Sequence, residues 1–311
     1  MEKVLCDCDN TMGVPGKPID DGQTLLYLLG RPDIDVLGVT TTFGNGTIDQ
    51  VYPATERLLR AAGRSDIPLW RGAGRRGQAP TEAARFLAET AAAHAGEITL
   101  LAIGPLGNLR AAAQLDPNFF HNLKQIVCMG GYLHPLEIPG WEDVGELNLA
   151  SDPEAASIVI NAPLRRGPES GGPLTLMNAH VCLQAPFGLP ELAPIERYGP
   201  EVYRMWRDYL LSWGAGNGAS SEYLWDLLPA VYISAPKLFD ANPVWIRSTV
   251  KDLETGTLVI DNKGEGARVN MPTRILNVDR FYAILYEAWA RALRNWNAGA
   301  NTQAAGRTSV E

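Results

Sequence analysis

The sequence predicts an α/β protein with an open, mostly parallel, Rossmann-like sheet flanked by helices and a more helical C-terminal half. Two observations indicate this fold class. Apolar, strand-like runs alternate with helix-like segments through the first half of the chain, which is typical of parallel βαβ units. Acidic and amide residues follow the ends of these runs, and open α/β sheets build their sites at the carboxyl ends of their strands.

The elements of the first half are bounded by Gly, Pro and Asn residues, which commonly end strands and helices. The predicted strands are residues 4–8, 35–43, 67–70, 98–103, 125–129 and 174–178. Helices are expected between them at residues 20–30, 47–62 and 81–94. A further helix begins at Asp152-Pro153-Glu154, which places Pro in its first turn and acids at its positive end.

The second half contains fewer strand signals and more helical periodicity. Helices are predicted at residues 201–213, 223–234 and 279–296, and residues 244–250 and 257–261 are expected to form an antiparallel pair. The polar residues after 297 lack the apolar content to fold. We therefore expect one α/β domain over residues 1–297 and a disordered tail over residues 298–311.

Charge and cysteine usage restrict the class of partner. The 311 residues carry a formal net charge of -8, which argues against nucleic acid or an anionic membrane as the partner and favours a small molecule. The four cysteines lie in apolar, strand-like runs, which is the pattern of reduced, buried thiols. The chain shows no apolar leader and no run long enough to span a bilayer, so a cytoplasmic protein is expected.

The strongest functional signal is a group of acids near the first strand. Asp7 and Asp9 follow Val4-Leu5-Cys6, and a second pair, Asp20-Asp21, opens the next helix. Four converging carboxylates repel one another unless a cation or shared protons hold them together. Oxygen ligands alone suit a hard cation such as Ca²⁺ or Mg²⁺. An alternative is that the second pair only caps its helix.

A short motif in the same segment offers one interpretation of these acids. Asp7-Cys8-Asp9-Asn10-Thr11 satisfies the DxDxT pattern of haloacid-dehalogenase-type Mg²⁺ phosphatases, in which the first Asp attacks phosphorus. Such an enzyme also needs a downstream phosphate-binding Lys and a later acidic pair at a strand end. The sequence offers no persuasive candidate for that set.

A second interpretation accounts for nearly the whole chain. The sequence resembles the inosine-uridine preferring nucleoside hydrolases, and six short matches occur in that family's order. They are Asp7-x-Asp9 with Asp20-Asp21, Thr40-Thr41-Thr42-Phe43-Gly44-Asn45, Ala102-Ile103-Gly104-Pro105-Leu106-Gly107-Asn108, Val127-Cys128-Met129-Gly130-Gly131, Gly145-Glu146-Leu147-Asn148 and Trp225-Asp226.

The resemblance implies an enzyme that uses Ca²⁺ to hydrolyse the N-glycosidic bond of ribonucleosides. It implies a Ca²⁺ bound by Asp9, Asp21, the main-chain carbonyl of Ile103 and Asp226. Asp9 is also implied as the base for a metal-bound water. The resemblance also implies the substrate contacts. Asp20 and Asn148 would hold the ribose hydroxyls, and Asn45 would line the bottom of the same sugar site. Met129 would pack beside the sugar, and Glu146 would bind the 5′-hydroxyl.

The chain departs from the common family pattern in two places. Residues 10–19 form an insertion between the two acidic pairs, which must loop out if Asp20 and Asp21 are to reach the metal. Trp225 stands where many pyrimidine-accepting members carry a His that can protonate the leaving base. A Trp there resembles the purine-preferring branch and can stack on the base, although indole has no titratable proton to give.

These features predict a nucleosidase that prefers purine nucleosides. Trp70 and Trp141 are candidates for a second stacking aromatic, and His134 is a candidate for contact with the base. The remaining alternative is a catalytically silent nucleoside-binding protein that keeps the metal and ribose contacts. Family resemblance further suggests a homodimer or homotetramer.

Overall fold

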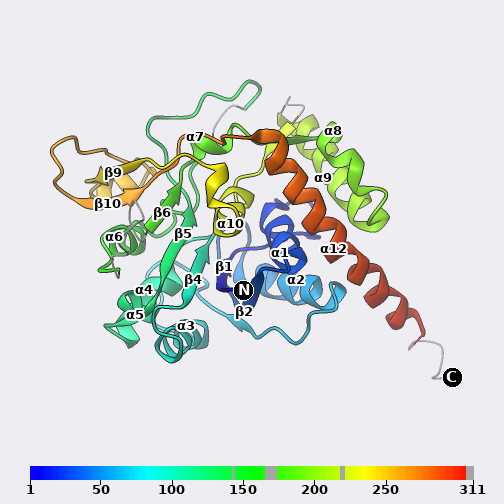
Figure 1. Ribbon diagram of the computed structural model, residues 1–311, viewed down its shortest axis with the longest axis horizontal. Coiled ribbons are helices and arrows are strands. Elements are labelled where there is room, and N and C mark those ends of the chain that lie inside the picture. Colours follow the sequence, from blue (N-terminus) through cyan, green and yellow to red (C-terminus); the bar gives the residue numbers. More distant parts are fainter. Residues whose placement is uncertain (142–143, 165–173, 218–220, 306–311) are drawn as a thin grey trace.

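A computed structural model describes residues 1–311 except for residues 142–143, 165–173, 218–220 and 306–311. Its centre is an eight-stranded sheet in the order β3-β2-β1-β4-β5-β6-β10-β9, in which only β9 runs antiparallel to its neighbour (Figure 1). The strands are β1 (Glu2–Cys8), β2 (Ile34–Thr41), β3 (Leu69–Arg71), β4 (Ile98–Ala102), β5 (Gln125–Met129), β6 (Leu174–Met177), β9 (Pro243–Ile246) and β10 (Ala267–Asn270). This architecture confirms the predicted fold class.

The longer helices form one layer on each face of the sheet. One layer contains α1 (Asp20–Gly30), α2 (Ile48–Ala61), α10 (Leu227–Ser234) and α12 (Val278–Ala305), and the other contains α3 (Glu82–Ala93), α4 (Gly107–Leu115) and α6 (Pro153–Ile160) (Figure 1). α9 (Pro200–Asn217) lies beside the first layer. The short elements are α5 (Phe119–Asn122), α7 (Ala179–Cys182), α8 (Leu189–Leu192), α11 (Val250–Leu253), and the antiparallel pair β7 (Pro186–Gly188) and β8 (Ser221–Tyr223).

Strand periodicity explains why both faces of the sheet are covered. In β1, Val4, Cys6 and Cys8 belong to the core under α1 and α12, whereas Leu5 belongs to the core under α3 and α4. Successive side chains of a strand point to opposite faces, so a strand that is apolar throughout must be buried on both sides. All four cysteines are buried and free, as predicted.

The strand order also fixes where a ligand can bind. β1 pairs with β2 on one side and with β4 on the other, so the direction of winding reverses at β1. Doubly wound sheets bind ligands in the crevice outside the strand ends at such a switch point. The residues that follow β1, β2, β4 and β5 therefore meet at one end of the sheet.

Three predicted elements differ in the structure. The predicted antiparallel pairing of residues 244–250 with 257–261 is confirmed in part, by an antiparallel bridge from Ile260 to Ile246 and by two backbone hydrogen bonds beside it. The regular ladder of β9, however, is formed with β10. The predicted helix at residues 223–234 begins only at Leu227, because Tyr223 ends β8, where it pairs with Pro186 of β7.

The helix predicted to end at residue 296 continues to Ala305, so the first part of the predicted tail is helical. Alanines favour the continuation and no Pro interrupts it, so the helix passes the stop signal that Gly299 offers. Residues 306–311 lie outside the described part of the chain. Among the described residues, no helix combines the length and apolar character needed to cross a membrane.

Candidate active site

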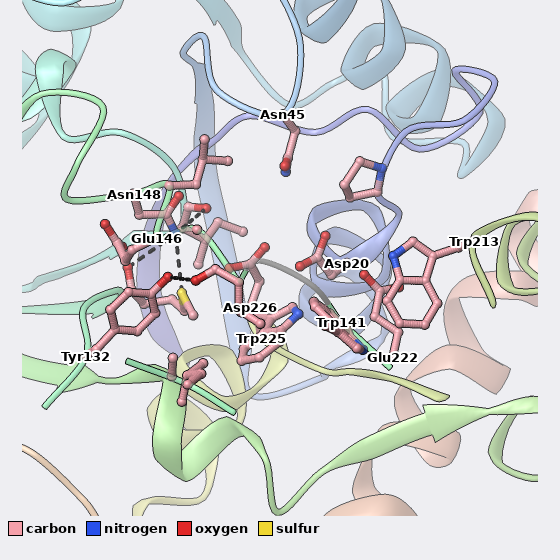
Figure 2. Close-up of a pocket in the computed structure, with 18 of the residues that line it drawn as sticks. Asp20, Asn45, Tyr132, Trp141, Glu146, Asn148, Trp213, Glu222, Trp225 and Asp226 are labelled. Carbon is pink, nitrogen blue, oxygen red and sulfur yellow. Dashed lines mark hydrogen bonds between the residues drawn. The ribbon is translucent and has the colours of Figure 1, made fainter. Parts of the chain in front are cut away.

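A cavity of about 320 Å³ opens at the carboxyl end of the sheet, at the switch point (Figure 2). This volume is at the lower end of the range for small-molecule sites. Its two ends differ in chemistry, with acidic residues between them. Glu146, Asn148 and Tyr132 lie at one end, and Trp141, Trp213 and Glu222 lie at the other (Figure 2).

The acids come from three elements that the fold brings together. Asp9 follows β1, Asp20 and Asp21 open α1, and Asp226 lies at the N-cap position of α10. Carboxylate oxygens of Asp20, Asp21 and Asp226 all lie within 4.8 Å of one another, and these three side chains are buried. We call Asp9, Asp20, Asp21 and Asp226 the acidic floor.

Backbone and amide donors hold Asp9 and Asp21 in place behind the cavity. The Asp9 amide donates to Oδ1 of Asp21 at 3.0 Å, and the Asn45 amide donates to Oδ2 of Asp9. The side-chain amide of Asn45 donates to Oδ2 of Asp21 at 2.9 Å. The insertion at residues 10–19 loops out as expected, because Asp21 still reaches the end of β1.

Close backbone approach shapes the pocket for the Asp9 carboxylate. Gly44 has φ of +157°, and a Cβ at this position would lie 1.9 Å from Oδ2 of Asp9. A Cβ on Gly104 would lie 2.9 Å from Oδ1 of the same group. Both loops must therefore carry Gly for Asp9 to occupy this position.

The acidic floor lacks the compensation that buried anions require. Oδ1 of Asp9 and Oδ1 of Asp20 are buried without a hydrogen-bond partner, and no described Lys or Arg forms an ion pair with any of the four acids. Burial raises the pKa of Asp9 to about 8, and burial together with neighbouring acids raises the pKa of Asp21 and Asp226 well above the usual range. Such oxygens fit a hard divalent cation. The donor set in the described residues therefore fits the cation that the sequence implies.

The polar end of the cavity is built around Glu146 and Asn148. Both carboxylate oxygens of Glu146 accept backbone N–H groups, from Gly131, Leu149 and Ala150, at 2.7–3.1 Å. The side-chain amide of Asn148 donates to the carbonyls of Ile103 and Met129, each at 3.3 Å. Asn148 thus ties the ends of β4 and β5 to the loop that carries Glu146.

The opposite end of the cavity is lined by aromatic rings. Trp141 contacts Trp213 edge-on with ring centroids 4.7 Å apart, and it contacts Trp225 at 6.2 Å. Tyr223 lies 5.4 Å from Trp225 by the same measure. Among these rings lies the buried carboxyl of Glu222, which accepts a hydrogen bond from the Tyr209 hydroxyl at 2.9 Å.

The structure brings the predicted site residues together. Those that line the cavity are Asp20, Asn45, Ile103, Met129, Glu146, Asn148, Trp225 and Asp226. Asp9 and Asp21 do not line the cavity themselves, but both accept hydrogen bonds from Asn45, which does. One detail differs from the implied ligand set. The three carboxylates that lie within 4.8 Å of one another include Asp20 and not Asp9. Oδ2 of Asp9 instead accepts a hydrogen bond from the Asn45 amide.

Of the other candidates, Trp141 lines the cavity, whereas Trp70 is exposed and stacks on Phe86. His134 is exposed and its ring packs against His180, away from the lining. Sequence reasoning missed Tyr209, Trp213 and Glu222. The four-residue spacing of Tyr209 and Trp213 on a predicted helix was a signal that one helix face carries aromatics, but it did not show what that face contacts.

Comparison with known proteins decides the family. The model of the inosine-uridine preferring nucleoside hydrolase family matches residues 4–283. The chain belongs to this family. It is a nucleoside hydrolase, an enzyme that hydrolyses N-glycosidic bonds, and the family match displaces the phosphatase interpretation of Asp7-Cys8-Asp9-Asn10-Thr11.

Relatives of this nucleoside hydrolase carry different substrate names. Uridine nucleosidase 1 of Arabidopsis thaliana is 26% identical over 84% of this chain and 82% of its own length. The pyrimidine-specific ribonucleoside hydrolase RihA of Shewanella woodyi is 28% identical over 89% of this chain and 94% of its own. Among solved structures, a purine-preferring ribonucleoside hydrolase from Gardnerella vaginalis superimposes with a TM-score of 0.78 at 18% identity, covering 94% of this chain and 99% of that one.

Proposed function

We propose that this nucleoside hydrolase converts a ribonucleoside and water into ribose and a free base in a Ca²⁺-dependent reaction. The observation that carries the proposal is the acidic floor, whose buried and uncompensated carboxylates lie between a polar end and an aromatic end. This arrangement suits a ligand with a polyhydroxylated half and a flat heterocyclic half. A nucleoside has both halves joined by the bond to be broken.

The proposed cation ligands are Asp9, Asp21, Asp226 and the carbonyl of Ile103, with Asp20 beside them. A Ca²⁺ held there would supply positive charge that could orient vicinal hydroxyls and make a nearby water more acidic. Asp9 is proposed as the base that takes a proton from the attacking water. Its raised pKa of about 8, which burial causes in the metal-free protein, falls when a cation compensates its charge.

The other residues are proposed to bind and orient the sugar. Asp20 and Asn148 hold ribose hydroxyls, Asn45 lines the same floor, Met129 packs beside the sugar, and Glu146 receives the 5′-hydroxyl. Glu146 already accepts three backbone N–H groups, which orient its carboxylate and favour the anionic form, while burial acts more strongly and raises its pKa. Anionic groups around the sugar stabilise the positive charge of an oxocarbenium-like transition state.

The base is proposed to lie at the aromatic end, stacked on Trp225. A preference for purines is supported by the number of rings there, and the substrate names of the sequence relatives oppose it. A cytoplasmic location and a homodimeric or homotetrameric assembly complete the proposal.

A reducing-sugar assay with inosine, adenosine, guanosine, uridine and cytidine in the presence of Ca²⁺ tests the proposed function. We expect ribose release, with inosine and guanosine turned over fastest. Faster turnover of uridine would remove the purine preference and keep the reaction. Binding of all five nucleosides without ribose release would identify a silent nucleoside-binding protein.

A further inference from the structure

If the proposed function holds, the departing base needs a proton, and the described residues that line the cavity include no obvious donor. A purine or pyrimidine anion is a poor leaving group, so general acid catalysis speeds its departure. None of the described residues that line the cavity is His, Lys or Arg. Trp225 can stack on the base, but its indole N–H does not titrate.

Most titratable groups of the cavity are already committed to other contacts. Asp20 and Asp226 belong to the acidic floor. Both oxygens of Glu146 accept backbone N–H groups at the opposite, sugar-binding end. The Tyr132 hydroxyl donates to the carbonyl of Val144.

The remaining acid, Glu222, lies where the base is expected. It is carried by β8, is 7% exposed, and lines the cavity among Trp141, Trp213 and Trp225 (Figure 2). Tyr209 of α9 donates a hydrogen bond to its Oε1, which orients the carboxyl. Among the described residues, Asp20 of α1 is the other titratable group that acts on it.

The surroundings of Glu222 favour its protonated form. Burial, followed by the negative charge of Asp20, raises its pKa well above the usual range, and the hydrogen bond from Tyr209 acts in the opposite direction. A carboxyl that stays protonated near neutral pH is able to donate a proton during catalysis.

We propose that Glu222, oriented by Tyr209, is the general acid that protonates the leaving base. As the bond between C1′ and the base nitrogen breaks, its electron pair moves into the base. The Glu222 proton passes to a ring nitrogen or an oxo oxygen of the base, while water adds to C1′ and gives a proton to Asp9. Glu222 regains a proton, and Asp9 loses one, by exchange with solvent after the products leave.

Substrates that differ only in their need for a proton provide the test. Uridine and inosine need protonation of the base, whereas p-nitrophenyl β-ribofuranoside releases a stable phenolate without it. For Glu222→Gln with Ca²⁺ present, we expect kcat for uridine and inosine to fall by about 10²–10³-fold, within the range that general acids contribute. Turnover of the nitrophenyl riboside should change by less than about threefold, because its leaving group needs no acid.

Glu146→Gln is the matched control, because it makes the same chemical change at the sugar end and should slow all three substrates by a similar factor. Equal loss on all three substrates in Glu222→Gln, or no loss on the nucleosides, would overturn the assignment of Glu222. Failure of the wild-type protein to release ribose from any substrate, the nitrophenyl riboside included, would instead overturn the proposed function.

The pH profile supplies a second test that does not depend on the Gln variant folding well. A general acid must be protonated, so kcat for uridine should fall as pH rises through the pKa of Glu222. Tyr209→Phe removes a hydrogen bond that lowers the pKa of Glu222. The fall of kcat on the alkaline side of the pH profile should therefore move to higher pH. A Tyr209→Phe variant in which kcat falls at the same pH as in the wild type would contradict the proposal.

Discussion

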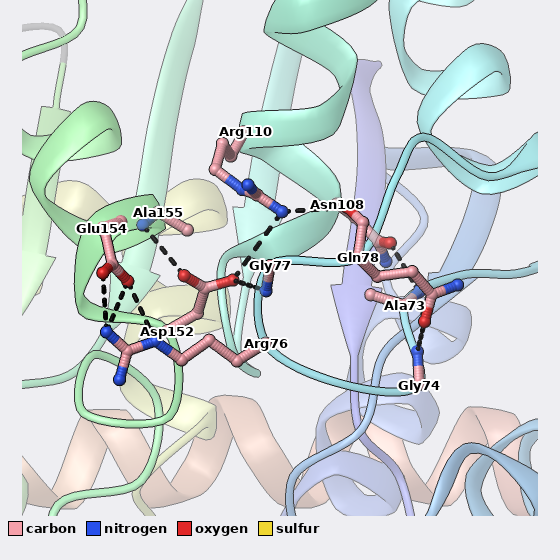
Figure 3. A network of polar contacts seen from close by, with 10 residues as sticks. All are labelled: Ala73, Gly74, Arg76, Gly77, Gln78, Asn108, Arg110, Asp152, Glu154 and Ala155. Atoms are coloured by element: carbon pink, nitrogen blue, oxygen red, sulfur yellow. Dashed lines mark hydrogen bonds and ion pairs between the residues drawn. The ribbon is translucent and has the colours of Figure 1, made fainter.

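Two groups of charged side chains in this protein contain buried carboxylates, and their surroundings compensate the carboxylate charge in one group but not in the other. The first is the acidic floor. The second, which we call the Asp152 network, consists of Asp152, Arg110, Arg76 and Glu154 (Figure 3). Asp152 is 1% exposed, as buried as the acids of the floor, yet its oxygens accept the amides of Ala155 and Gly77 and lie 4.0 Å from the Arg110 guanidinium.

The difference shows how a structural carboxylate is distinguished from a functional one. The Asp152 carboxylate is compensated without a ligand, because it caps α6 and also accepts the Gly77 amide, although Nε of Arg110 is buried without a partner. Arg76 pairs with Glu154 at 2.7 Å and fastens the loop after β3 to the same helix. The acidic floor is incomplete without a cation, because two of its oxygens are buried without a partner. Burial alone therefore does not distinguish the two carboxylates, whereas the partnerless oxygens of Asp9 and Asp20 mark a difference from Asp152, whose two oxygens both have partners.

The largest expected difference between the two groups is in activity, when one carboxylate of each group is replaced by a neutral amide. Asp226→Asn should lose Ca²⁺ affinity by more than the roughly 10–100-fold that loss of an outer partner costs a metal site, and turnover should fall with it. Asp152→Asn keeps a good helix cap and should leave kcat/KM within about twofold of the wild type. Isothermal titration with Ca²⁺ and ribose release measure both variants, and equal loss of activity in the two would erase the distinction between the groups.

The second comparison uses two glycines with positive φ. Gly44→Ala places a Cβ on the Asp9 carboxylate, so activity should fall by about 10²-fold or more through misplacement of that group. Gly77, whose amide donates to Asp152, has φ of +67° and open space around a Cβ, so Gly77→Ala should cost about 1–2 kcal/mol of stability and little activity. Steady-state kinetics beside urea unfolding separates the two effects. A fully active Gly44→Ala variant would show that Asp9 need not occupy this position.

The last expected effect concerns stability and not turnover, and it is a pH dependence of unfolding in the metal-free protein. Burial raises the pKa of Asp7 to about 7 and of Asp9 to about 8, from a usual value of 3.8. The folded state then binds more protons than the unfolded state between about pH 4 and pH 8, so stability should fall as pH rises through this window. Thermal unfolding after chelation should show the decline. Added Ca²⁺ should raise Tm more at pH 8 than at pH 5, and a larger gain at pH 5 would contradict this origin.

Much of the fold and of the acidic floor was predictable from the sequence, because both follow from local pattern. Apolar runs followed by Asp9, Asn45, Ile103 and Met129 mark strand ends, and parallel strands bring their carboxyl ends to one edge. The alternation of side chains along β1 also explains why Cys6 and Cys8 belong to the same core.

The aromatic end was less predictable, because it depends on how distant segments dock. Glu222 lies in a three-residue strand that pairs with β7 and has no local signature of a site. Tyr209 and Trp213 come from α9, which lies away from the central sheet, so only tertiary packing places them over the cavity. The pairing of β9 with β10 was missed for the same reason, since the closer segment at residues 257–261 was equally plausible by pattern.

Restoring Ca²⁺ to metal-free protein while following ribose release from inosine and uridine tests the central claim most directly. The account predicts negligible turnover after exhaustive chelation and full recovery on back-titration with Ca²⁺, with recovery absent in Asp226→Asn and normal in Asp152→Asn. Full turnover by the chelated wild-type protein, or equal recovery in both variants, would contradict the assignment of the acidic floor as the cation site of this hydrolase.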